Sequence, residues 1–295
     1  DSMFIGTNAG VGSSGAQGSV FIGNTAGSGV TDFLQSVMIG DHAGIGAENS
    51  GVMFHSMNED NPHEMGSVVN FIGSHAGAYS YDCSYSDFIG RLAGNKANGL
   101  PYSVAIGYKA LASATSGVWD DKLGGSSSKK STIAVGFMAG KNGSGNPLST
   151  FIGWQAGMDA TGNVGCTYIG QYAGLEAGSV DASGYGNGNL RTLAIGRYAA
   201  KEASGIKNSV FIGEGAGNNA HTFDEVVAIG SYVANLGRDY RASVLAGYYA
   251  GYGHSGIYES VLIGNMVGAT FNTSVPVSGS DEAKRVESSV LIGER

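Results

Sequence analysis

Apolar side chains alternate along short segments of this chain, and each segment ends in Ile-Gly or a close variant. The residue before the glycine is Ile in 13 of 15 copies, and the residue two places before that is apolar in 11. Side chains alternate between the two faces of a strand, so these two positions share one face and the residue between them points the other way. Apolar positions that recur every two residues, rather than every 3.6 residues, predict strands and argue against helices.

The glycine of this dipeptide recurs with a fixed period. Ten of the fourteen gaps between successive copies have a length of 17, and the other four exceed this length by 16, 12, 9 and 12. Such a period indicates a solenoid whose repeats stack as coils. We therefore predict an all-β fold, a β-solenoid of about 15 coils with a 17-residue repeat. The glycines are Gly6, Gly23, Gly40, Gly73, Gly90, Gly107, Gly136, Gly153, Gly170, Gly196, Gly213, Gly230, Gly247, Gly264 and Gly293.

The residues after each strand indicate a tight corner and a polar return. Three places after the glycine the residue is Ala in 12 of 14 copies, and the next is Gly in 11. Small residues fit a corner where backbones approach closely. The rest of each coil is mainly Ser, Gly, Asn, Thr and Ala, which favour turns. One strong strand and one weak strand per coil predict a flattened roll, whereas a hexapeptide β-helix would show three equivalent strands.

We predict a single solenoid over residues 1–295, with loop insertions at about 45–67, 112–132, 175–192 and 269–289. All four insertions follow the corner, so they should project from one edge of the rod. Loops on a rigid scaffold commonly carry binding sites. An equally good interpretation is that the insertions shield the stack of coils from lateral aggregation.

Both faces of the predicted strand are apolar, which a lone roll does not need. We expect the Ile and Val positions to fill the thin interior, and the position between them to form an exposed stripe. Apolar stripes of that length mark interfaces, so we predict a homotrimer around the rod axis. The alternative is a roll wide enough to bury both faces. The interface residues predicted here are Phe21, Phe71, Phe88, Phe151, Phe211, Leu245 and Leu262.

Composition limits the classes of function. The net charge is −8 with no basic patch, so no nucleic-acid partner is expected. No apolar run reaches the length of about 18 residues that a membrane-spanning helix needs, so no membrane insertion is expected. Two distant cysteines imply no disulfide framework. The chain begins with Asp1, and we expect a mature product or a fragment of a fibre that continues beyond at least one end.

The repeat resembles those of known fibrous proteins. Ser-Val-Phe-Ile-Gly-x-x-Ala-Gly at 19–27 and 209–217 resembles the repeats of bacteriophage tail fibres. Ser-Val-Ala-Ile-Gly-x-x-Ala at 103–110 is similar to the head repeats of trimeric autotransporter adhesins. The resemblance implies a left-handed, homotrimeric β-roll at a virion or extracellular surface, where such fibres attach to hosts. A bacterial trimeric adhesin head is the alternative to a phage fibre.

Aromatic residues cluster in the two positions after each glycine, where we expect exposed turns. Their rings suit stacking against a cell-surface glycan, and equally suit covering a neighbouring coil or subunit. A further tryptophan lies in the second insertion. The candidate glycan-binding residues are Trp154, Tyr172, Tyr198, Tyr248, Tyr249 and Trp119.

Enzymatic and metal chemistry have weak support. One insertion contains His55, Glu59, Asp60, His63 and Glu64, but the spacing matches neither the zinc helix motif nor a calcium loop, so we predict no metal site and no cofactor. A tailspike-like polysaccharide depolymerase would need two carboxylates about 5–9.5 Å apart. Nothing singles out such a pair, and we predict no enzyme. The possible pairs join Glu48, Glu59 or Asp60 to Asp120 or Asp121.

Overall fold

The computed structural model describes residues 1–48, 68–115, 131–180, 186–269 and 286–294. Over these residues the chain consists of short strands and turns and contains no helix, so none of the described segments is a helix that could span a bilayer. The strands stack in parallel, coil upon coil, which confirms the predicted all-β solenoid. The contacts divide the chain into two compact units, Asp1–Leu148 and Ser149–Arg295, and each is described by itself.

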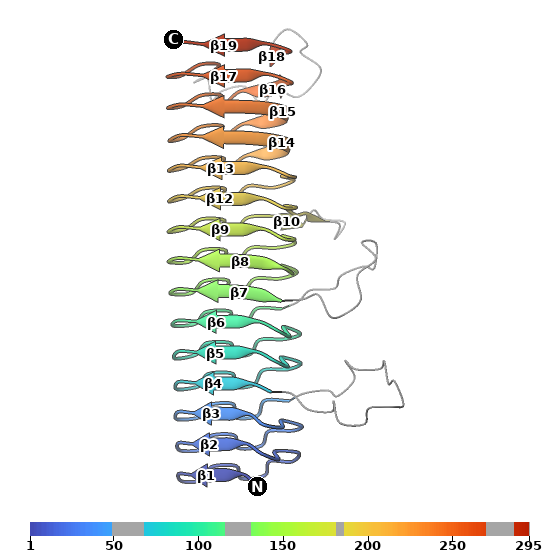
Figure 1. Ribbon diagram of the computed structural model, residues 1–295, viewed down its shortest axis with the longest axis vertical. Coiled ribbons are helices and arrows are strands. Elements are labelled where there is room, and N and C mark those ends of the chain that lie inside the picture. The colour runs from blue at the N-terminus through green and yellow to red at the C-terminus, as the bar shows by residue number, and fades with distance from the viewer. Residues whose placement is uncertain (49–67, 116–130, 181–185, 270–285, 295) are drawn as a thin grey trace, which may run out of the picture. The chain divides into compact units, whose positions relative to one another are not determined.

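The first unit is a stack of single-strand coils (Figure 1). Each strand pairs in parallel with the next along the chain, and the register never shifts, so that Phe4 lies beside Phe21 and Phe71 beside Phe88. Its strands are β1 (Met3–Ile5), β2 (Val20–Ile22), β3 (Val37–Ile39), β4 (Asn70–Ile72), β5 (Asp87–Ile89), β6 (Val104–Ile106) and β7 (Thr132–Val135).

The second unit repeats this stack with longer strands near its C-terminal end. β14 and β15 pair along both walls of the coil, from His221 beside Arg238 to Ile229 beside Ala246. β10 and β11 form a separate antiparallel pair. The strands are β8 (Ser149–Ile152), β9 (Thr167–Ile169), β10 (Ser179–Val180), β11 (Gly186–Asn187), β12 (Leu193–Ile195), β13 (Val210–Ile212), β14 (His221–Ile229), β15 (Arg238–Ala246), β16 (Ser255–Tyr258), β17 (Val261–Ile263), β18 (Val286–Glu287) and β19 (Val290–Ile292).

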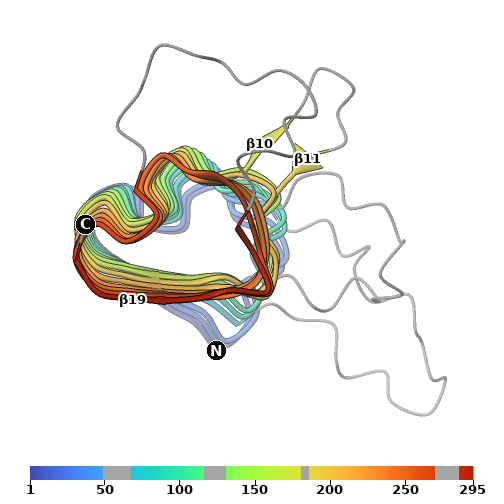
Figure 2. The ribbon, with the colours of Figure 1, turned by 90° about the horizontal axis from the view of Figure 1, so that it is seen from above.

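Seen from above, the coils within each unit follow one flattened outline (Figure 2). In the first unit the wall opposite the strands is held by single parallel bridges between successive coils, such as Ser14 with Thr31 and Tyr81 with Asn98. This wall is the weak polar return that the sequence predicts. The insertions predicted at about 45–67, 112–132 and 269–289 lie largely outside the described residues, whereas the antiparallel pair of β10 and β11 belongs to the one predicted at about 175–192.

The glycine of each Ile-Gly is required by the stacking. At Gly90 the φ angle is +131°, and a Cβ there would lie 2.6 Å from the carbonyl oxygen of Gly107 in the next coil. Real Cβ atoms do not approach a carbonyl oxygen that closely, and residues other than glycine rarely adopt this backbone conformation. The glycine column therefore sets how closely the coils stack.

A column of buried hydroxyls ties most coils to themselves and to the next, with Val69, Cys166 and Val226 as exceptions in the column. The Oγ atom of Ser86 donates a hydrogen bond to the Leu100 carbonyl across the coil (2.8 Å) and accepts one from the Ser103 backbone N–H (3.1 Å). Ser19 makes the same two contacts nearer the N-terminus, with the Phe33 carbonyl and the Ser36 N–H. Backbone groups at the start of each strand would otherwise be buried without partners, at a cost of about 1–3 kcal/mol each.

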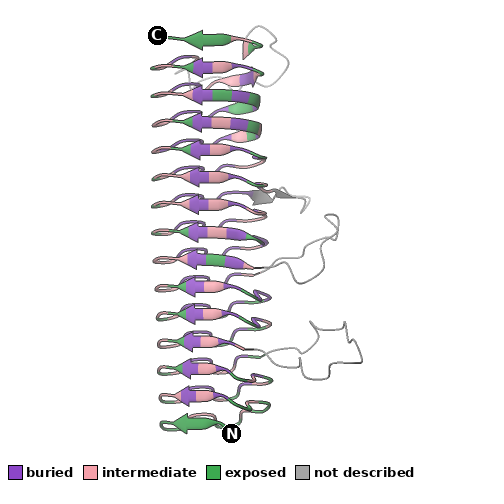
Figure 3. Ribbon diagram, in the orientation of Figure 1, coloured by how far each residue is buried: buried purple, intermediate pink, exposed green. Residues whose placement is uncertain are grey.

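The assignment of the two strand faces is opposite to the prediction. The central residue of each strand points into the coil, as the buried bands in Figure 3 show for the inner strands of both units. Phe71 and Phe88, for example, stack inside the roll with ring centroids 5.1 Å apart. The predicted interface residues are at most 1% exposed within one chain and form its core, so the prediction for them is wrong: Phe21, Phe71, Phe88, Phe151, Phe211, Leu245 and Leu262.

The Ile and Val columns instead lie on the outer face of the sheet. In the first unit Ile39, Ile72, Ile89 and Ile106 are 36–40% exposed in four consecutive strands. The second unit has the same arrangement, and Ile229 there is 46% exposed. The physical reason is the closure of the coil. The corner after each strand folds back over the central side chain, as when Gly27 packs on the ring of Phe21.

Candidate functional site

The turns that follow the strands hold aromatic side chains in register. The second residue after each strand glycine has a positive φ, near +59° at Tyr172 and Tyr198 and near +55° at Tyr232 and Tyr249. Its backbone N–H bonds to a carbonyl of the turn one coil earlier, as Tyr198 does to Gln171 (2.9 Å). Equivalent side chains of neighbouring coils are therefore stacked.

Four tyrosines of the second unit form what we call the tyrosine ladder: Tyr172, Tyr198, Tyr232 and Tyr249. The rings of Tyr172 and Tyr198 stack with centroids 5.1 Å apart, and those of Tyr232 and Tyr249 with centroids 5.2 Å apart. Gly215 occupies the equivalent position in the coil of β13, and a Cβ there would lie 2.6 Å from the Tyr232 ring. The ring of Tyr232 thus covers the space that a side chain at 215 would take.

A charged pair joins the two halves of the ladder. The guanidinium of Arg197 lies 4.9 Å from the ring centroid of Tyr198 and 3.4 Å from a carboxylate oxygen of Glu214. Tyr232 donates its hydroxyl hydrogen bond to the same carboxylate at 3.3 Å. Desolvation and the Glu214 carboxylate raise the pKa of Tyr232, which keeps its phenol a neutral donor. The result is a continuous surface from Tyr172 to Tyr249.

Two aromatic side chains beside the ladder are the most accessible. Trp154 is 47% exposed and Tyr248 is 48% exposed, whereas Tyr172, Tyr198 and Tyr249 are only half-exposed. Tyr248 meets Tyr249 edge to face at 4.3 Å. Within the ladder the ring faces cover one another, so the predicted glycan contact is best offered by the indole of Trp154 and the ring of Tyr248.

The other predicted candidates are separated from this surface or lie outside the described residues. Trp119 lies outside them, as do the histidine-rich cluster at 55–64 and the acidic pair at 120–121. Glu48 is described, and its backbone bridges to Thr31 and Tyr81 in the return wall. Five of the six predicted binding residues therefore lie in the turns of successive coils of the second unit, from Trp154 after β8 to Tyr248 and Tyr249 after β15.

The charged link in the ladder was not among the residues predicted from the sequence. Arg197 and Glu214 occupy the first position after the glycine in successive coils, and their opposite charges one repeat apart are a signal that the sequence alone could have given. Tyr252 also contacts Tyr249 edge to face, with ring centroids 4.9 Å apart, although it is the fifth residue after Gly247 rather than the first or second.

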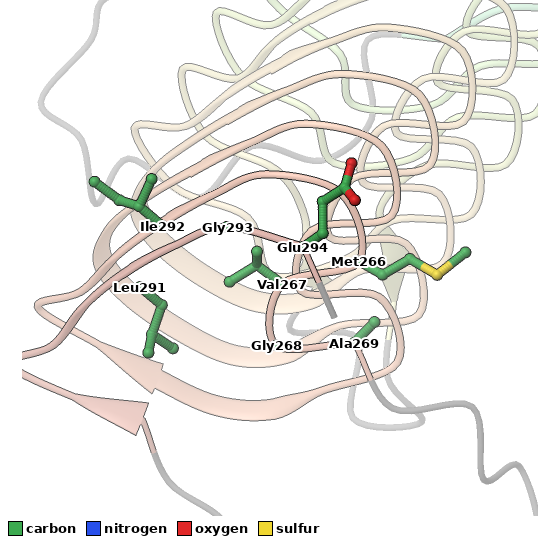
Figure 4. Close-up of a pocket in the computed structure, with 8 residues that line it drawn as sticks. All are labelled: Met266, Val267, Gly268, Ala269, Leu291, Ile292, Gly293 and Glu294. Carbon is green, nitrogen blue, oxygen red and sulfur yellow. The ribbon is translucent and has the colours of Figure 1, made fainter.

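An open hollow of about 390 Å³ lies at the last described coil of the second unit (Figure 4). Its lining is aliphatic side chains and glycine backbone, with the carboxylate of Glu294 as its one charged group. Binding sites for small molecules usually combine an enclosed apolar wall with several converging polar groups. This hollow lacks that combination, so the aromatic surface is the better candidate for a binding site. Its lining residues are Met266, Val267, Gly268, Ala269, Leu291, Ile292, Gly293 and Glu294.

Comparison with known proteins does not assign a family. No protein-family model matches the chain, and no curated protein is significantly similar to it.

Proposed function

We propose that this chain is a structural and adhesive segment of an extracellular or virion fibre, similar to a phage tail fibre, and that it works as a homotrimer. One observation supports this proposal above the others. In each unit the outer face of the parallel sheet carries a ladder of Ile, with Val135 and Ala246 as the exceptions, and this ladder is partly open to solvent. The neighbouring column is mainly Val but includes Asn70, Asp87, Thr150 and Thr167. Parallel sheets are normally covered on both faces, so a bare apolar face calls for a partner.

A second copy of the same chain is the partner that best fits this face. The ladder presents one row of apolar side chains per coil, at a coil spacing of about 4.8 Å. An identical ladder has the same spacing along its whole length, and an unrelated surface rarely does. The repeat's resemblance to tail-fibre and adhesin repeats favours three copies, left-handed coils and about 15 coils per chain.

Light scattering coupled to size-exclusion chromatography tests the oligomer. The intact chain has a mass of 30.0 kDa, so a trimer should elute with about three times that mass. Ile72 and Ile106 would be buried on assembly. The double variant Ile72→Lys with Ile106→Lys should yield monomers, because two ammonium groups would be desolvated in each contact.

The matched control is Val11→Lys, which places the same charge on a turn residue that is 56% exposed and off the sheet face. This variant should keep the trimer mass. A monomeric parent chain, or a double variant that remains trimeric while folded by circular dichroism, would contradict the proposal.

We place attachment to a cell-surface glycan at Trp154 and Tyr248. Flat aromatic faces stack on the apolar faces of sugar rings, and these two side chains are accessible without disturbing the coil core. The double variant Trp154→Ala with Tyr248→Ala should abolish adsorption of the labelled protein to host cells. The control Tyr79→Ala removes an aromatic ring of comparable exposure from the first unit and should leave adsorption intact. Adsorption by the double variant equal to the parent's would exclude this site, whatever the oligomeric state.

A further inference from the structure

Two histidines and a carboxylate meet on adjacent turns of the first unit. Asp41 and His42 follow Gly40 at the end of β3, and His75 holds the position equivalent to His42 after β4. The imidazole rings are stacked with centroids 4.7 Å apart and planes 4° from parallel. One possible ligand atom from each of the three side chains lies within 4.8 Å of the other two.

The backbone of the stack fixes this meeting. His42 and His75 both have a φ of +57°, the same left-handed turn conformation. The His42 N–H bonds to the Asn24 carbonyl, and the His75 N–H bonds to the Asp41 carbonyl, each at 2.9 Å. The two rings therefore stay on one edge of neighbouring coils. Rotation of the side chains alone is enough to change the direction in which their nitrogen atoms point.

Neighbouring polar groups orient the three side chains. Asn24 donates a hydrogen bond to Oδ1 of Asp41 (3.0 Å), and the Ser74 hydroxyl lies 3.0 Å from Nδ1 of His75. Nδ1 of His42 is shielded from solvent and lies 2.8 Å from Oδ1 of Asp41, but at angles that do not make a hydrogen bond. The Ser74 contact is of the kind that orients histidine ligands in metal sites, since it holds a ring atom other than the one that would bind the ion.

We propose that Asp41, His42 and His75 bind one divalent ion of the zinc class. Two imidazoles and a carboxylate suit zinc, nickel or copper, whereas calcium and magnesium prefer oxygen ligands alone. Tetrahedral zinc with bonds of about 2.0 Å places its ligand atoms about 3.3 Å apart. The side chains of His42 and Asp41 are 33% and 51% exposed, so they have room to rotate about Cβ–Cγ. Such rotation would bring the ligand atoms, now within 4.8 Å of one another, to the separation that zinc requires. Water completes the coordination.

The ion would act as a clamp between two coils at an interruption of the repeat. The separation of His42 and His75 in sequence is nearly twice the length of an ordinary coil, because the first insertion lies between their coils. A longer connection costs more entropy to close. A metal bridge from one coil to the next would hold the stack together at this point without a covalent link.

Isothermal titration of the full chain with zinc chloride tests the site. The parent should bind at micromolar affinity or better, and His42→Gln and His75→Gln should each weaken this binding at least tenfold. The matched control is the double variant His55→Gln with His63→Gln, which removes two histidines of the first insertion and should bind like the parent. An absence of zinc binding by the parent, or retention of its affinity in His75→Gln, would overturn the proposal.

A second measurement separates loss of the site from loss of the fold. Saturating zinc should raise the melting temperature of the parent and of the control variant, but not that of His75→Gln, whose circular dichroism should match the parent's. Cobalt in place of zinc should give the visible absorption of a coordinated ion with nitrogen ligands, lost in the same variant. A zinc-dependent rise in melting temperature that persists in His75→Gln would place the ion elsewhere and overturn the assignment.

Discussion

The phenol of Tyr168, buried in the core of the second unit, accepts a hydrogen bond from the side-chain amide of Asn189 at 3.0 Å. It donates one to Oδ1 of Asn163 at 2.9 Å. The two asparagine side chains in turn donate to the carbonyls of Ala203 and Ala177. One hydroxyl therefore completes a polar network that links neighbouring coils through the interior.

The first prediction is that Tyr168→Phe destabilises the second unit by about 1–3 kcal/mol. The ring still fills its space, but the buried side chains of Asn189 and Asn163 each lose their hydrogen bond to the phenol. Urea unfolding, followed by circular dichroism, measures the change in the free energy of unfolding.

The control for this experiment is Tyr248→Phe, which removes an equivalent hydroxyl from a ring that is 48% exposed. Its effect should stay within about 0.5 kcal/mol, as for most surface substitutions. Equal unfolding midpoints for the two variants would show that the network contributes nothing to stability.

The repeat made the coil, the corner and the return wall predictable from sequence, but not which strand face is inside. Val37, Met38 and Ile39 are all apolar, so alternation separates two faces without saying which one is covered. The missing information lay elsewhere in the coil. Ala228 is a small residue in the core column, and Phe223 of the same coil is also buried and packs against the ring of Phe211, the neighbour of Ala228 in the preceding coil. Such compensation of volume across a closed interior identifies the buried column.

The site was partly predictable for a related reason. A fixed period places equivalent residues in register, so the stack of Tyr172 on Tyr198 follows from the sequence once the coil is known. The exposed fraction of each ring does not follow, because it depends on what the neighbouring coil presents. Gly215 interrupts the ladder, and Arg197 and Glu214 join its two parts.

The second prediction concerns the glycine column. Gly90→Ala should destabilise the first unit by more than about 3 kcal/mol, since the added Cβ would lie 2.6 Å from the Gly107 carbonyl oxygen and φ is +131°. Gly29→Ala is the control, because its φ is +68° and nothing lies within 4 Å of its Cβ position. It should cost about 1–2 kcal/mol, the strain of a left-handed residue alone. Urea unfolding of both variants compares the two costs, and similar values would mean that the coils can move apart.

The third prediction is that both thiols are inert in the folded chain. Burial raises the pKa of Cys83 to about 12, and burial also raises the pKa of Cys166. Only the thiolate reacts, so Ellman's reagent at pH 8 should detect no thiol in the native protein and two after denaturation. Gln17→Cys adds an exposed thiol as a control and should react at once. Rapid reaction of the native parent would show that the coils open readily.

The fourth prediction is that acid destabilises the second unit through two histidines. Burial lowers the pKa of His254, and burial together with Arg238 lowers the pKa of His221. The unfolded chain therefore binds more protons than the folded chain once the pH falls below about 6.5. Stability should be complete above that pH and should decline as the pH is lowered toward the depressed values. The urea midpoint should accordingly be lower at pH 5.5 than at pH 7.5.

Replacing both side chains, His221→Gln with His254→Gln, isolates their share of this pH dependence. Glutamine can still hydrogen-bond to the Ser204 hydroxyl, which lies 2.7 Å from Nδ1 of His221, but it takes up no proton in this range. In this double variant the difference between the urea midpoints at pH 5.5 and pH 7.5 should fall to less than half of the difference in the parent. The double variant His55→Gln with His63→Gln changes the same number of titrating groups outside the second unit and should keep the full difference. If the two double variants lose pH dependence equally, desolvation of His221 and His254 is not its cause.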